Sequence, residues 1–134
     1  MPSDDDPGET LPEILSAAFD TFEAVRHLAR RCEDQAPDLF PVFMSAAAAA
    51  AAGRDAIAHA PALPVLTRQV SVTSQPGIDA GPEQAADSIA ASASALATAL
   101  GHWAALAPDP RDRRACRDAA SAATQICHLM ERRP

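Results

Sequence analysis

The large apolar residues of this chain recur at alternating steps of four and three residues, and this spacing constrains its fold more than any other feature. In the first such segment the steps run through Leu11, Leu15, Ala18, Phe22, Val25, Ala29 and Cys32. A repeat of this kind places apolar side chains along one stripe of an α-helix. Similar stripes elsewhere predict four helices in all, at about residues 11–34, 38–60, 82–107 and 110–132.

Local start and stop signals support these boundaries. Thr10 and Glu13 have the spacing of a capping box, and Asp38 and Asp109 are expected to cap the second and fourth helices. The breaks between helices contain prolines, which cannot continue a helix. Only a few residues separate helix one from helix two and helix three from helix four, so each half predicts an antiparallel hairpin.

The expected fold is therefore an all-α, antiparallel four-helix bundle built from two helical hairpins. Residues 1–9 are acidic and predict a disordered tail, which leaves 10–134 as a single helical-bundle domain. A long connection at 61–81 joins helices two and three, and the sequence leaves open whether it crosses the bundle or forms a lid. The helix start and stop signals of the first half recur in the second half at offsets of 70 and 71 residues. Either a duplication or chance explains this recurrence.

The composition predicts a thin core. Alanine accounts for 33 of the 134 residues, whereas Leu, Ile, Val and Phe together number 24. A buried alanine methyl contributes about 0.8 kcal/mol, against about 1.5 to 3 kcal/mol for a large aliphatic side chain. The free energy gained by burying such a core is little larger than the free-energy cost of the conformational entropy lost on folding. Burial of further surface against a second chain is the expected remedy.

The net charge of −7 argues against phosphate contacts to nucleic acid and against binding to an anionic membrane. The longest apolar run, 39–52, is also shorter than the roughly 20 residues that a membrane span requires. Three cysteines without paired spacing and a start without signal-peptide features predict a cytoplasmic location. We therefore expect neither a nucleic-acid nor a membrane partner.

No catalytic, cofactor or metal site is predicted. Glu23 and His27 lie four residues apart, and His128 precedes Glu131 by three, but both pairs fall off the predicted apolar stripes, whereas a metal site in a bundle core needs inward-facing ligands. The sequence has no phosphate-binding glycine loop, nucleophile elbow or Cys-x-x-Cys pair. The prediction leans towards a protein that is not an enzyme.

The start of the second helix is the strongest candidate interface. Residues 39–44 are apolar on every side of the predicted helix, so they require cover all round. Either the apolar part of the 61–81 connection or a second chain supplies that cover. On the second interpretation, the contact residues are Phe40, Val42, Phe43 and Met44, with Val70 and Val72 in second place.

A basic segment at the start of the fourth helix is a candidate anion-binding site, formed by Arg111, Arg113, Arg114 and Arg117. Cations in the first turn oppose the helix dipole, so a partner anion is one explanation, and a solvated surface is the simpler one.

The leading hypothesis is a non-enzymatic bundle that acts through protein–protein interaction, first of all with itself; a heterologous protein partner is the other form of this hypothesis. One alternative is a bundle that binds a small molecule in an apolar cavity, with 61–81 as its lid. Another is a helical enzyme that uses the arginines on an anionic substrate.

Overall fold

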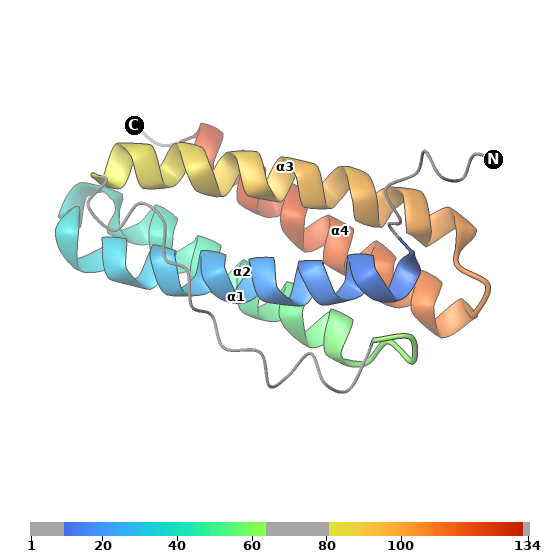
Figure 1. The fold of residues 1–134 in the computed structure, drawn as a ribbon. Helices are drawn as coiled ribbons and strands as arrows, with labels where there is room; N and C mark the ends of the chain where they lie inside the picture. The colour runs from blue at the N-terminus through green and yellow to red at the C-terminus, as the bar shows by residue number, and fades with distance from the viewer. Residues whose placement is uncertain (1–9, 64–80, 133–134) are drawn as a thin grey trace.

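The computed structural model describes residues 10–63 and 81–132, which form a four-helix bundle (Figure 1). Helix α1 spans Leu11–Gln35, α2 spans Phe40–Ala58, α3 spans Pro82–Leu106 and α4 spans Pro110–Glu131. The predicted fold is confirmed, and every helix boundary lies within two residues of its predicted position. The tail at 1–9 lies outside the described residues, as do Val70 and Val72.

The helices occupy the corners of a square. α1 packs against α2, α2 against α4, and α4 against α3, while α1 and α3 close the square with a smaller contact. α2 and α3 therefore lie at opposite corners. Both hairpins are antiparallel, and α2 and α3 run in the same direction (Figure 1). The end of α2 and the start of α3 consequently lie at opposite ends of the bundle, and the connection between them joins these ends.

Two of the three predicted helix caps are confirmed. The backbone N–H of Glu13 donates to Thr10 Oγ1 over 3.4 Å, and the N–H of Thr10 donates to Glu13 Oε1 over 3.0 Å. Asp109 Oδ1 accepts from the N–H of Arg111 over 2.8 Å. Each of these contacts satisfies an N–H group that has no partner within its helix.

The prediction that Asp38 caps the second helix is wrong. A 3-10 turn, η2 (Pro37–Leu39), precedes α2. The N-cap residue of α2 is Leu39, whose side chain forms no capping hydrogen bond. The N–H of Leu39 donates to the carbonyl of Ala36 over 2.9 Å, and that of Phe40 donates to the carbonyl of Pro37. Because the turn already satisfies these N–H groups, no cap from Asp38 is needed.

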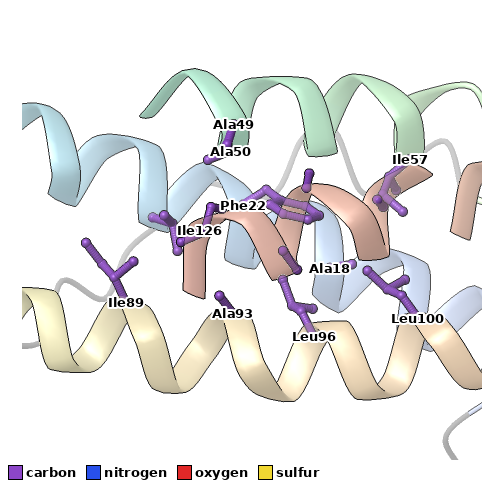
Figure 2. Close-up of a cluster of buried hydrophobic side chains, with 14 of the residues drawn as sticks. Ala18, Phe22, Ala49, Ala50, Ile57, Ile89, Ala93, Leu96, Leu100 and Ile126 are labelled. Carbon is purple, nitrogen blue, oxygen red and sulfur yellow. The ribbon is translucent and has the colours of Figure 1, made fainter. Parts of the chain in front are cut away.

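About half of the buried apolar residues of the core are alanines, and larger side chains lie among them. Figure 2 shows Phe22 of α1 between the alanines of α2 and the side chains of Ala93 and Leu96 on α3. The largest fully buried side chains are Phe22, Phe43, Leu15, Ile57, Ile89, Leu100, Ile126, Met130 and Cys116. These large side chains lie in one cluster with the buried alanines.

The Phe22 ring of α1 packs directly against Gly53 of α2. A Cβ atom added at Gly53 would lie 2.5 to 2.9 Å from three atoms of the Phe22 ring, which is closer than carbon atoms pack. Glycine is required here because the ring occupies the position of a side chain. The small residues on the apolar stripe of α2 thus allow α1 and α2 to pack closely, as their size indicates.

We predict that Gly53→Ala destabilises the protein by about 1 to 3 kcal/mol. The added methyl group overlaps the Phe22 ring, and overpacking of this kind outweighs the gain of about 1 kcal/mol that alanine brings to a helix. Urea denaturation followed by circular dichroism measures the difference.

Gly101→Ala in α3 is the matched control. No described atom outside the local helix lies within 4 Å of a Cβ atom at Gly101, so this change is expected to stabilise the protein by about 1 kcal/mol through helix propensity. Equal effects at the two positions would contradict the close contact between Phe22 and Gly53.

Candidate functional site

The side of α2 that points away from the core is apolar and exposed. Successive turns place Phe40, Met44, Ala48, Ala52 and Asp55 on this side, and all five are exposed. We call these residues the outward face of α2. Phe40 is 41 % exposed and Met44 is 49 % exposed, and the chain has no charged residue between Leu39 and Gly53. Water therefore contacts an apolar surface along three turns of the helix.

The structure separates the predicted interface residues into two groups. Phe40 and Met44 lie together on the outward face, whereas Val42 is half-buried and packs against the core. Phe43, which was also predicted as a contact residue, is fully buried in the core. Phe43 is therefore a packing residue, and a substitution there tests stability rather than binding.

The charged residues are unevenly distributed among the four helices. Asp, Glu and Arg number eight on α1 and seven on α4, against two each on α2 and α3. Since α2 and α3 lie at opposite corners, the bundle has two highly charged corners and two nearly uncharged ones. Charged residues are depleted at the centre of protein interfaces, which points to the uncharged corners as candidate binding surfaces.

α3 forms the second uncharged corner. Within residues 10–63 and 81–132, it is the one helix that is long and apolar enough to cross a membrane, and 22 % of its most apolar stretch is buried in the bundle. Core helices of soluble proteins meet the same length and composition criteria. Length and composition alone therefore do not decide whether α3 has a membrane role. The apolar character of α3 is less evident in the sequence than that of the run at 39–52, because its alanines alternate with Ser and Thr.

One further large apolar side chain is exposed among the described residues, Leu106 at the end of α3, which is 56 % exposed. It lies at the opposite end of the bundle from Phe40. Nearby, the ring of Trp103 packs edge-on against that of His102, with 5.7 Å between their centroids. Trp103 is half-buried against the core, so Leu106 is a single exposed residue rather than part of a continuous apolar face.

Two of the four arginines predicted to bind an anion already contact acceptors in their own chain. Arg111 pairs with Asp109 over 3.1 Å. Arg113 Nη1 donates to the carbonyls of Ala107 and Pro108 over 2.8 and 3.1 Å, which caps the end of α3. Arg114 and Arg117 are exposed. This arrangement weakens the hypothesis of a site for an anionic substrate.

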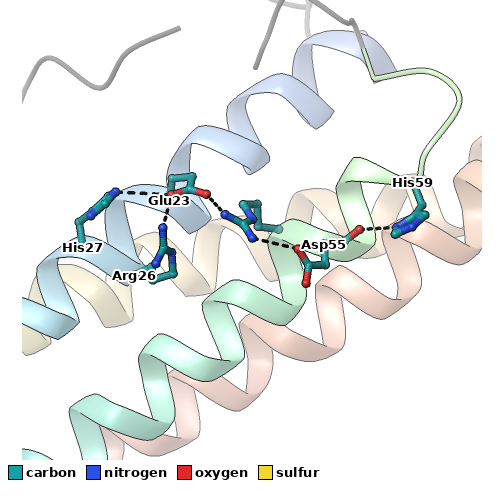
Figure 3. A network of polar contacts seen from close by, with 6 residues as sticks. Glu23, Arg26, His27, Asp55 and His59 are labelled. Carbon is teal, nitrogen blue, oxygen red and sulfur yellow. Dashed lines mark hydrogen bonds and ion pairs between the residues drawn. The ribbon is translucent and has the colours of Figure 1, made fainter. Parts of the chain in front are cut away.

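A polar network joins α1 to α2 beside the outward face (Figure 3). Glu23 of α1 forms an ion pair with Arg54 of α2, and it also contacts Arg26 over 3.1 Å and His27 over 3.5 Å. Arg54 in turn contacts Asp55 over 3.0 Å. Burial raises the pKa of Glu23, but hydrogen bonds from Arg54 and Arg26 and the charges of these residues outweigh burial, so its pKa lies below the ordinary value.

Asp112 in the first turn of α4 is the one buried charged residue among those described. Its Oδ1 accepts from the backbone N–H of Ala62 over 3.0 Å, which ties the segment after α2 to the start of α4. Asp112 lies one helical turn before Cys116 of the apolar stripe of α4, and this spacing within one helix gave no sign of a partner 50 residues away.

The cysteines are unsuited to nucleophilic chemistry. Burial, with a smaller effect from the charge of Asp112, raises the pKa of Cys116 to about 11. Burial also raises the pKa of Cys32 and of Cys127. A thiol is reactive as its thiolate, so these side chains act as small apolar residues. Within the described part of the chain, no three His, Cys, Asp or Glu side chains are grouped so as to hold a metal ion.

The chain matches no protein-family model, no curated protein and no solved structure.

We predict that Glu23→Gln destabilises the protein by about 1 to 2 kcal/mol near pH 7, because a charged acceptor in a partly buried network is replaced by a neutral one. The pKa of Glu23 is lowered from its ordinary value of 4.5. Its stabilisation is therefore fully present above that pH and is lost as the pH falls through the folded-state pKa. Urea denaturation over a pH series measures the difference between variant and parent.

Asp118→Asn serves as the control for this pH series, because Asp118 is exposed on α4 and forms no ion pair with a described residue. A loss of stability for Glu23→Gln that stays constant down to acid pH would contradict the assigned role of the carboxylate.

We also predict that Asp112→Ala destabilises the protein by about 1 to 3 kcal/mol, since the N–H of Ala62 loses its acceptor. Asp112→Asn retains an acceptor oxygen and is expected to recover part of this loss. Hydrogen–deuterium exchange at the Ala62 amide should accelerate in the alanine variant. Unchanged exchange there would show that the contact does not hold this segment.

Proposed function

We propose that this protein is a non-enzymatic interaction protein that self-associates through the outward face of α2. The observation that carries the proposal is the exposure of Phe40 and Met44 on a helix face whose one charged residue, Asp55, lies at the far end of the face. A helix that is apolar all round is normally buried, whereas the other described helices cover α2 on its core side and leave Phe40 and Met44 exposed.

The energetics of the core support the same proposal. Alanines make up about half of the buried apolar residues, so each helix contributes less burial than in a bundle rich in leucine. Covering the outward face removes further apolar surface from water without changing the fold. The contact area of one helix is small, and small interfaces are typical of weak or transient association. We therefore expect dissociation in the micromolar range.

The charge distribution supports this choice of surface. α1 and α4 carry most of the charged residues, and desolvating these faces would be costly. The outward face of α2 lies between them, so an apolar contact there has a polar rim on both sides. An apolar centre with a polar rim is the usual anatomy of a protein interface.

We predict that Met44→Glu weakens self-association by about tenfold or more, because a carboxylate is then placed at the centre of an apolar contact. Met44 is exposed, so the fold should be retained, and circular dichroism checks this. Sedimentation velocity across a dilution series measures the dissociation constant of parent and variant.

Leu106→Glu is the matched control, because it introduces the same charge at an exposed apolar residue of the other uncharged corner. It is expected to leave the dissociation constant unchanged. A parent chain that stays monomeric at every concentration would contradict the proposal, and so would equal weakening by the two variants.

A further inference from the structure

We infer that two copies of this chain pair with their α2 helices antiparallel, with Ala48 close to the twofold axis and Asp55 as the residue that selects this orientation. The inference rests on the proposed self-association and adds the geometry of the interface. It follows from the order in which large, small and charged residues occur along the outward face.

Shape favours the antiparallel arrangement. The large exposed side chains, Phe40 and Met44, lie at the start of the outward face, and the small ones, Ala48 and Ala52, lie further along. With Ala48 on the twofold axis, Met44 of one copy lies opposite Ala52 of the second. Met44 then meets a small side chain, which allows close packing, and Phe40 of one copy lies at the level of Asp55 and Ala56 of the second.

A parallel arrangement fits the same face poorly. Phe40 and Met44 would each meet their own counterpart at one end of the contact. These pairs would hold the helices apart at the level of Ala52, where neither copy has a side chain long enough to fill the space. Packing defects of this kind are costly because the atoms that line them lose contacts.

Charge selects the same orientation. Asp55 is the one charged residue of the outward face, and its side chain is 63 % exposed. In a parallel pair the two Asp55 carboxylates would face each other, and like charges at short range repel; the contact of each Asp55 with its own Arg54 over 3.0 Å offsets part of this repulsion. In the antiparallel pair Asp55 lies seven residues from the axis, so the two carboxylates are about 21 Å apart along the helices. That separation exceeds the screening length at physiological salt.

The outward face of α3 fits α2 less well than a second α2 does. Its exposed residues include Ser94, Thr98 and His102, whose polar groups would lose water without a partner on α2. A contact between α2 of one copy and α3 of another would also use a different surface on each copy. Such contacts build open chains of molecules or rings, whereas twofold pairs are the commonest assemblies of identical chains.

Cysteine cross-linking of the full chain tests the geometry. Under mild oxidation, Ala48→Cys is expected to form a disulfide-linked dimer, because residues at a twofold axis between packed helices come within disulfide reach. Met44→Cys and Ala52→Cys should link in a mixture of the two variants, with about tenfold more dimer than either variant gives alone. The parent chain, treated alike, controls for links through its own Cys127.

The Asp55 assignment has its own measurement. Removing the charge with Asp55→Asn takes away the penalty on the parallel pair. Self-linking of Met44→Cys should therefore rise in the double variant relative to Met44→Cys alone. Unchanged self-linking would show that Asp55 does not select the orientation.

The outcomes separate this inference from the proposed function. Self-linking of Met44→Cys in the presence of Asp55, or a link between Met44→Cys and Ala95→Cys on α3, overturns the antiparallel pair and leaves association through α2 standing. The antiparallel pair is also overturned, and association through α2 still stands, in one further case. In that case none of the cysteine variants forms a disulfide-linked dimer, although sedimentation shows a dimer that Met44→Glu dissociates. A parent chain that is monomeric at every concentration overturns both.

Discussion

The contact between the Phe22 ring and Gly53 governs how the bundle is built. It brings α1 and α2 so close that the ring occupies the space of a side chain on α2. A close approach of this kind requires small residues on the stripe of α2 that faces the neighbouring helices. The alanines of α2 meet this requirement, and the ring supplies the volume that they lack.

The outward side of α2 contains few charged residues. Its seven consecutive alanines continue around the helix and leave Arg54 and Asp55 as the only charged residues of α2. Arg54 is engaged with Glu23 of α1, so it helps to fix the hairpin. The charged residues of the four helices lie chiefly on α1 and α4. An apolar face on α2, bordered by charged helices, follows from this division.

The sequence predicted the local features of the fold well. Helix positions followed from the spacing of apolar residues, and the caps at Thr10 and Asp109 followed from side chains that act on N–H groups two or three residues away. Asp38 was predicted wrongly because the 3-10 turn that begins at Pro37 satisfies the first N–H groups through the backbone. A cap and a turn of this kind compete for the same N–H groups.

Contacts between distant segments escaped prediction for a physical reason. Glu23 meets Arg54, and Asp112 meets Ala62, because of which helices become neighbours and at what height. The spacing of apolar residues within one helix reveals neither which helices become neighbours nor the height at which their side chains meet. The candidate site was predicted in part: the sequence identified the start of the second helix, but the packing of its neighbours decides that Phe43 points inward and Met44 outward.

Methyl NMR of the unmodified chain across a dilution series tests the central claim most directly. If the outward face of α2 is where copies meet, the Met44 methyl resonance shifts with concentration while those of Leu106 stay constant. A Met44 resonance that does not change up to the highest soluble concentration, or a Leu106 resonance that changes as much, would contradict the account.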